Sequence, residues 1–120
     1  MSAVTLRISR NNAAVPGGIA AAVTAARLGC SVALAEYHPR LGGMTASGIG
    51  KSDIEHRPLF RGLFAEFVGL VRKHYTDKYG AASQNVKLCR DGYFFEPSVA
   101  ESIYGRSSYK AENASFTGSR

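Results

Sequence analysis

Residues 16–36, PGGIAAAVTAARLGCSVALAE, decide the expected fold, because an amphipathic helix is followed there by a short apolar strand. Apolar residues recur at intervals of three and four positions, which is the period of one helix face. They are Ile19, Ala22, Val23 and Ala26. Gly29 ends this pattern, as glycine often does just after a helix. Residues 31–35 have the length and continuity of a strand buried on both faces of a parallel sheet, so we predict a strand-helix-strand crossover over residues 17–36.

The stretches on either side of this unit are less regular. Residues 3–8 alternate well enough to form a first strand, but the polar turn formers of residues 9–12 interrupt them, so the pattern leaves that strand open. After the unit, residues 39–50 contain four glycines within nine residues from Gly42. So many glycines disfavour a regular element, and we predict an ordered loop.

The second half of the chain returns to a helical period. Residues 58–76 carry aromatic and aliphatic side chains on one side, which predicts a long amphipathic helix. Residues 80–85 suit a loop, and the aromatic run at residues 93–95 suits a strand. The S-x-x-E spacing at residues 98–101 is typical of a capping box that opens a third helix, which Gly105 should end.

The composition indicates a globular unit. A chain of 120 residues with 45% hydrophobic and 20% charged residues forms about one small domain or part of one, and is neither disordered throughout nor a disulfide scaffold. The net charge of +6 would suit a polyanion, but Lys and Arg are scattered from Arg7 to Arg120 without a dense block. We therefore expect no nucleic-acid partner and keep a basic nucleic-acid-binding module only as an alternative.

Side chains that could ligate a metal are too dispersed for a metal site. Cys30 and Cys89 form neither a C-x-x-C pair nor part of a Cys/His quartet, and we expect them to be buried free thiols. The three histidines lie 18 residues apart and share no helix face. They are His38, His56 and His74. We expect no metal, we assign no catalytic side chain, and we interpret Asp53 with Glu55 as a helix cap rather than an acid–base pair.

No transmembrane span is expected, because the longest apolar stretch, residues 13–26, is shorter than the roughly 20 residues that a membrane helix needs. We expect a cytoplasmic location. An N-terminal targeting segment is the alternative, since residues 1–35 contain three arginines and no acidic residue.

The candidate binding site is that of an adenine dinucleotide. Such a site needs a glycine-permissive turn, a helix N-terminus for the pyrophosphate and a carboxylate after the second strand for the ribose. Pro16, Gly17 and Gly18 open the first helix, and Glu36 follows the strand. A negative charge there would disfavour the 2′-phosphate of NADP. Taken singly, these residues would also suit a plain helix entry and an exposed acid at a strand end.

Four pieces in this order resemble the FAD-dependent oxidoreductase family. They are residues 16–22 (PGGIAAA), residues 25–29 (AARLG), Glu36 and residues 41–44 (LGGM). The resemblance covers residues 15–104 and implies an α/β fold, namely a partial Rossmann-type FAD/NAD(P)-binding domain with an incomplete parallel sheet and flanking helices. It also implies FAD as cofactor and, in complete relatives, a small-molecule substrate held by a downstream domain.

The resemblance assigns the adenosine end of the cofactor to the first crossover. Pro16, Gly17 and Gly18 would approach the pyrophosphate, and Glu36 would hold the adenosine ribose. Arg40 would lie on the adenosine side, although it could equally be a solvated surface charge.

The glycine-rich stretch would serve the middle of the cofactor. Gly42, Gly43 and Met44 would lie along the diphosphate-to-ribityl part, while Ser47 and Gly48 would lie nearer the flavin. The rival interpretations are that the double glycine only turns the chain and that Met44 is ordinary core packing.

One part of the family pattern is missing. Relatives have glycines where this chain has Ala13 and Ala14, and an apolar first strand where it has the polar residues 9–12. A methyl group in a turn that needs positive φ or close phosphate approach costs about 1–3 kcal/mol, so cofactor affinity should fall by one to two orders of magnitude.

We therefore expect a divergent N-terminus over residues 1–14, a truncated FAD-binding Rossmann-like domain over residues 15–104 and a disordered tail over residues 105–120. On this hypothesis the chain is the dinucleotide-binding fragment of an FAD-dependent oxidoreductase, too short to be active alone. The alternative is a non-catalytic fragment or pseudo-enzyme that pairs with another chain through an unsatisfied sheet edge.

Overall fold

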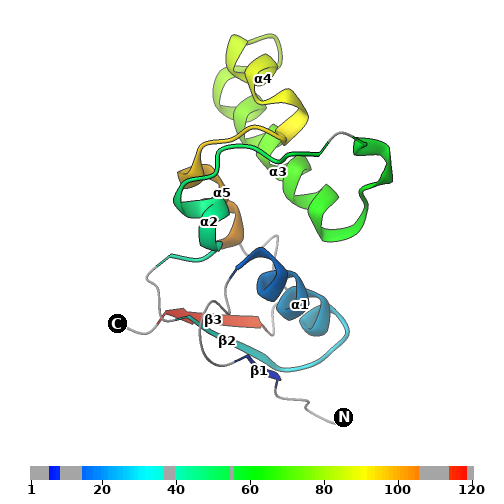
Figure 1. Ribbon diagram of the computed structural model, residues 1–120, viewed down its shortest axis with the longest axis vertical. Coiled ribbons are helices and arrows are strands. Elements are labelled where there is room, and N and C mark those ends of the chain that lie inside the picture. Colours follow the sequence, from blue (N-terminus) through cyan, green and yellow to red (C-terminus); the bar gives the residue numbers. More distant parts are fainter. Residues whose placement is uncertain (1–5, 9–14, 37–39, 55, 106–113, 119–120) are drawn as a thin grey trace.

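The computed structural model describes residues 6–8, 15–36, 40–54, 56–105 and 114–118. These residues form two regions: a small sheet carrying one helix, and a group of helices stacked beyond that helix (Figure 1). Helices account for most of the described residues. Among these residues, none of the helices is long and apolar enough to cross a membrane.

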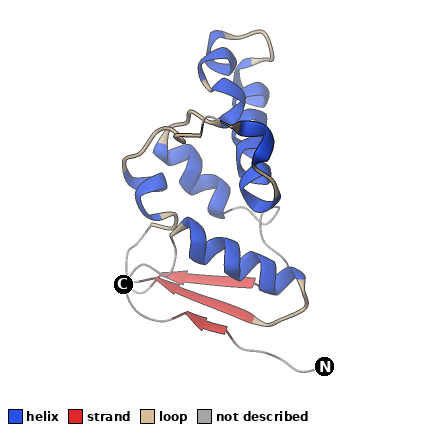
Figure 2. Cartoon of the chain, turned by 45° about the vertical axis from the view of Figure 1, so that its right-hand side comes forward, coloured by secondary structure: helices blue, strands red, loops and turns tan. Residues whose placement is uncertain are grey.

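Three short parallel strands make up the sheet, in the order β1-β2-β3. They are β1 (Leu6–Ile8), β2 (Val32–Glu36) and β3 (Ala114–Gly118). The register pairs Leu6 with Val32 and Val32 with Ala114. The helix α1 (Pro16–Arg27) joins β1 to β2 and lies over one face of the sheet (Figure 2).

The sequence predicted α1 and β2 to within a residue or two, and the helix prediction is confirmed. Its four periodic apolar residues are all buried. The expectation that the strand is buried on both faces was wrong, since Val32 and Leu34 are buried under α1 whereas Ala33 is exposed. Ala33 points to the opposite face because successive side chains of a strand alternate in direction.

We predicted that the glycine-rich stretch is a loop, but part of it is helical. The five-residue helix α2 (Gly43–Ser47) begins directly after Gly42. Gly42 and Gly43 have φ values of +107° and +55°. Glycine takes such values without steric cost, so the chain can turn sharply here and then continue as a helix through residues 44–47.

The central helix of the second region is α3 (Gly62–Tyr79). We predicted a helix over residues 58–76, so the predicted start lies four residues before the observed one. Arg57–Leu59 instead form a short 3-10 turn, η1, that contains Pro58. Gly62, with φ +68°, then redirects the chain into α3.

Smaller elements follow α3, and several differ from expectation. Ser83, in the predicted loop, caps α4 (Gln84–Leu88) by accepting a hydrogen bond from the N–H of Val86 at 3.2 Å. The 3-10 turn η2 (Arg90–Gly92) precedes the aromatic run. The predicted strand at residues 93–95 was wrong, because only Phe94 makes a bridge, to Lys51.

The last helix, α5 (Pro97–Gly105), ends at the predicted glycine. The capping-box prediction was wrong, since Ser98 already lies inside the helix. Val99 N–H donates to Glu96 C=O at 2.9 Å, which places Glu96 at the helix start, with Pro97 at the first position, where its missing N–H costs nothing. Residues 114–118, for which we expected disorder, form β3, which pairs in parallel with β2 along its whole length.

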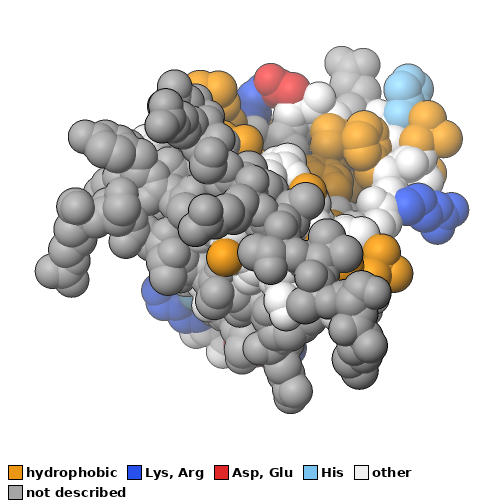
Figure 3. All heavy atoms as spheres, turned by 90° about the horizontal axis from the view of Figure 1, so that it is seen from below, with side chains coloured by type: hydrophobic (Ala, Val, Ile, Leu, Met, Phe, Trp, Pro, Cys, Tyr) orange, Lys and Arg blue, Asp and Glu red, His pale blue; other side chains and the backbone are white. Residues whose placement is uncertain are grey.

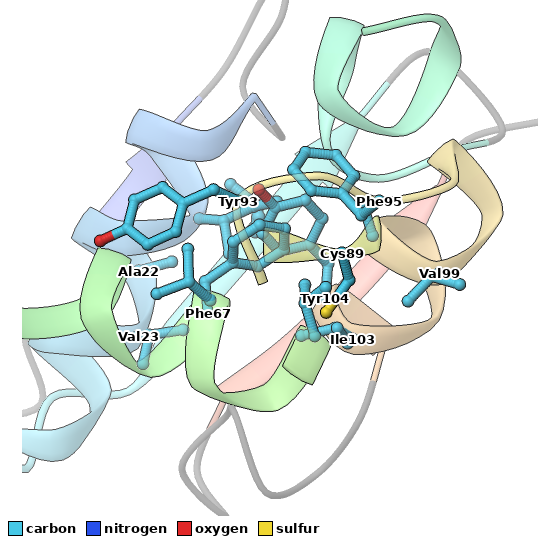
Figure 4. Packing of buried hydrophobic residues seen from close by; sticks show 14 of the residues in the cluster. Ala22, Val23, Phe67, Cys89, Tyr93, Phe95, Val99, Ile103 and Tyr104 are labelled. Carbon is cyan, nitrogen blue, oxygen red and sulfur yellow. The ribbon is translucent and has the colours of Figure 1, made fainter. Parts of the chain in front are cut away.

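Aromatic rings fill the core between α3 and α5 (Figure 4). Phe67 of α3 stacks on Tyr104 with ring centroids 5.1 Å apart and meets Phe95 edge-on at 5.4 Å. All three side chains are buried. Buried Cys89 belongs to the same core, and both cysteines are free thiols, as expected; Cys30 is only half-buried.

One ion pair links the sheet region to the helical region. Arg27 at the end of α1 donates two hydrogen bonds to the Glu66 carboxylate of α3, at 2.7 and 2.9 Å. This hydrogen bonding lowers the pKa of Glu66 below its ordinary value of 4.5. A lowered folded-state pKa means that the pair stabilises the fold above pH 4.5 and that this contribution is lost as the pH falls through the folded pKa.

Glu66→Gln should therefore lower the free energy of unfolding by less than about 1 kcal/mol at neutral pH, because both side chains are partly solvated. Well below pH 4.5 the variant and the parent chain should be equally stable. Urea unfolding of both proteins at the two pH values measures this, and a difference that persists or grows in acid would contradict it.

Candidate functional site

Among the described residues, the N–H groups of Gly17 and Gly18 in the first turn of α1 have no hydrogen-bond acceptor. The first intrahelical bond runs from Ile19 N–H to Val15 C=O at 3.0 Å, so the N–H groups of Gly17 and Gly18 precede the helical ladder. Pro16, at the first helical position, has no N–H group. The turn contains no acidic side chain that would offset the positive end of the helix dipole.

Gly17 is exposed, and a Cβ placed on it would meet no atom within 4 Å. The packing of the described residues therefore gives no reason for a glycine at this position. What the missing side chain does provide is open space beside the free N–H groups, which suits the close approach of a phosphate.

The structure brings the double glycine to the same helix end. A Cβ on Gly43 would lie 2.9 Å from Val15 Cγ1, and Val15 is the residue that precedes α1. A Cβ on Gly42 would lie 2.6 Å from two ring carbons of Tyr104. These two glycines do more than turn the chain, because each also permits a tight contact.

Glu36 is the last residue of β2, and its backbone pairs with Gly118. Because β1 and β2 are parallel and α1 follows β1, the end of β2 lies at the sheet edge from which α1 starts. The structure describes the backbone of Glu36 but not its side chain, and Ala13 and Ala14 lie outside the described residues.

The remaining residues expected at the site lie on the surface. Arg40 is exposed, and Met44 is 71% exposed, which contradicts its interpretation as core packing. Ser47 and Gly48 are exposed at the opposite end of α2 from the double glycine. The structure therefore brings Gly43 against Val15, next to Gly17 and Gly18 in the chain, and Gly42 against Tyr104. It leaves Arg40, Met44, Ser47 and Gly48 exposed.

Two residues that shape this region were missed in the sequence. Tyr104 supports Gly42, and Val15 supports Gly43. Tyr104 follows the helical period of α5, which signals burial, but no local pattern pairs it with a glycine more than 60 residues earlier.

Two pockets lie away from these residues. One, of about 270 Å3, is lined by Gly50, by residues of α3 and α4 and by residues 94–96. The other, of about 380 Å3, lies between residues 51–54 and Arg90. Among the described residues, no three His, Cys, Asp or Glu side chains gather closely enough to hold a metal ion.

Comparison with known protein families gives a match. The sequence model of the family described as FAD dependent oxidoreductase matches residues 14–114. Because this match spans most of the chain, the protein belongs to the FAD-dependent oxidoreductase family. No curated protein and no solved structure shows a significant match.

The described residues fit part of FAD. Free N–H groups at α1, the open space at Gly17 and the end of β2 at the same sheet edge suit a pyrophosphate and the ribose next to it. Gly43 packs against Val15 at the start of α1.

Proposed function

We propose that this chain binds the ADP part of FAD at the N-terminus of α1, within an FAD-dependent oxidoreductase. The observation that carries the proposal is Gly17, which is exposed at a helix end with free N–H groups and has no packing reason to be glycine. On this proposal, β1, α1 and β2 are the first crossover of a Rossmann-type α/β domain.

Each residue then has a defined part. The N–H groups of Gly17 and Gly18 donate to the pyrophosphate, and the carboxylate of Glu36 accepts hydrogen bonds from the ribose hydroxyls. Arg40 lies on the adenosine side. When bound, FAD supplies hydride chemistry at its isoalloxazine ring, and the protein contributes binding and orientation.

The glycine-rich segment completes the proposal. Gly42 and Gly43 hold their segment close to α1, and the exposed Met44 side chain lies along the middle of the cofactor. Ser47 and Gly48 lie toward the flavin end.

Gly17→Ala tests this function. An added methyl group has open space in the protein, so the free energy of unfolding should stay the same or rise slightly, whereas FAD affinity should fall about tenfold or more, which corresponds to about 1.4 kcal/mol. Flavin absorbance retained after incubation with FAD and desalting, followed by a fluorescence titration, measures the affinity.

Gly69→Ala is the matched control, because Gly69 is also an exposed helical glycine with nothing within 4 Å. It should leave FAD binding unchanged. Equal FAD affinity in both variants and the parent would remove the proposed role of Gly17.

The alternative of a non-catalytic chain that pairs with a partner has one observation in its favour. Ala33 is exposed, although the faces of parallel sheets are normally covered on both sides. A chain that never retains FAD and sediments as a dimer would favour this alternative.

On the face shown in Figure 3, the Lys and Arg side chains of the described residues are dispersed rather than joined in a stripe. This face therefore gives no support to the nucleic-acid alternative.

A further inference from the structure

The larger of the two pockets described above is mostly polar; it lies between residues 51–54 and the η2 turn, and its volume is about 380 Å3. Three cationic side chains line it, together with the Ser52 hydroxyl, the Phe94 ring and the Asp53 carboxylate. The cations are Lys51, Arg57 and Arg90. The volume is that of a site for a small molecule, and none of these residues belongs to the FAD site proposed above.

Backbone hydrogen bonds join the two segments that line this pocket, residues 50–52 and residues 93–95. Ser52 N–H donates to Tyr93 C=O at 2.8 Å, and Phe95 N–H donates to Gly50 C=O at 2.9 Å. Lys51 and Phe94 form the bridge between these bonds. The pocket therefore has a preformed frame rather than two independent loops.

The backbone on the Arg90 side of the pocket adopts a conformation of unfavourable energy. Arg90 and Asp91 have φ values of +45° and +61°, in the left-handed region that residues other than glycine, asparagine and aspartate seldom adopt. Gly92 continues the turn against the backbone of Val68 in α3. Backbone strain of this kind clusters at active sites, ligand clamps and switch regions.

Cations outnumber carboxylates around the pocket. Lys51 pairs with Asp53 at 2.8 Å, and Asp91 is shared by Arg57 at 3.4 Å and Arg72 at 3.7 Å. Arg90 stacks over the Phe94 ring at 5.1 Å and, among the described residues, pairs with no carboxylate. Counted over the described residues alone, four cations in and beside the pocket thus face two carboxylates, an excess of positive charge within that set.

From this arrangement we propose that the pocket binds the phosphate or carboxylate group of a small anionic molecule. The Arg90 guanidinium, held against Phe94, makes the main charged contact. Lys51 and the Ser52 hydroxyl donate from the opposite wall, and the Phe94 ring provides an apolar surface for the rest of the molecule. The positive field of the cluster favours entry of an anion.

The test is a residue-resolved NMR titration of the full chain with inorganic phosphate and, separately, with succinate, at constant ionic strength. Saturable amide shifts at residues 51–54 and 90–94 are expected. A response to phosphate alone identifies a phosphate site, a response to succinate alone a carboxylate site, and a response to both a general oxyanion site. The absence of saturable shifts in these segments with either anion overturns the proposal.

Arg90→Asn provides the decisive variant, because asparagine tolerates the left-handed conformation while the change removes the cation and its contact with the Phe94 ring. The thermal midpoint should not fall, whereas anion affinity should fall at least tenfold. Lys78→Gln, which removes one cation from a residue that does not line the pocket, should leave affinity unchanged. Equal weakening by both variants overturns a specific role for Arg90. Shifts at Gly17 and Gly18 report the α1 site separately, so failure at either site is seen on its own.

Discussion

Gly92→Ala is expected to lower the free energy of unfolding by about 3 kcal/mol or more, since a left-handed non-glycine residue and an overpacked contact each cost about 1–3 kcal/mol. Gly92 has φ +95°, and its Cβ would lie 1.9 Å from the carbonyl oxygen of Val68. That oxygen belongs to the backbone of α3 and cannot rotate away as a side chain could. The residue is buried, so the η2 turn would have to separate from α3.

Urea unfolding of Gly92→Ala beside Gly69→Ala measures this effect. Gly69 lies within α3, is exposed and has space for a methyl group, so its replacement should raise stability by about 0.5–1 kcal/mol through helix propensity. Opposite signs for the two glycines are the expected result. A loss below about 1 kcal/mol for Gly92→Ala would show that the turn does not pack against Val68 as closely as described.

The sequence predicted the elements whose cause is local. The apolar period of α1 and the run of β2 depend on neighbours within one element, and both lie within a residue or two of their predicted places. Where tertiary contacts decide the local conformation, as at residues 93–95, the prediction from sequence was wrong. The aromatic residues 93–95 have strand propensity, but Gly92 turns them toward α3, where Tyr93 and Phe95 are buried.

The same distinction applies to the candidate site. Gly17 and Glu36 were predicted as site residues from their spacing around one helix, because that spacing follows from a single crossover. The contact between Gly43 and Val15, and the support of Gly42 by Tyr104, join segments that are distant in sequence. A single sequence carries no signal for such pairs, so the double glycine was identified only through its family resemblance.

Gly42→Ala should impair both the fold and the proposed cofactor site. Gly42 has φ +107°, and its Cβ would lie 2.6 Å from the ring of Tyr104 and 2.8 Å from Ala46 Cβ. Tyr104 cannot move aside, because it is 3% exposed and stacked on Phe67. We expect a loss of about 2–4 kcal/mol in the free energy of unfolding.

The double glycine segment would then be pushed away from α5 and from Val15. FAD affinity should fall together with stability in Gly42→Ala, whereas Gly17→Ala loses affinity alone. Gly48→Ala is the matched control within the same segment, since Gly48 has an extended φ of 178° and open space, and its fold stability should not change by more than about 0.5 kcal/mol. Thermal unfolding of the three variants, with FAD titration of Gly42→Ala and Gly17→Ala, separates the two roles; Gly48→Ala is a control for stability only. If Gly42→Ala kept full stability, Tyr104 would not be the support that fixes the double glycine beside α1.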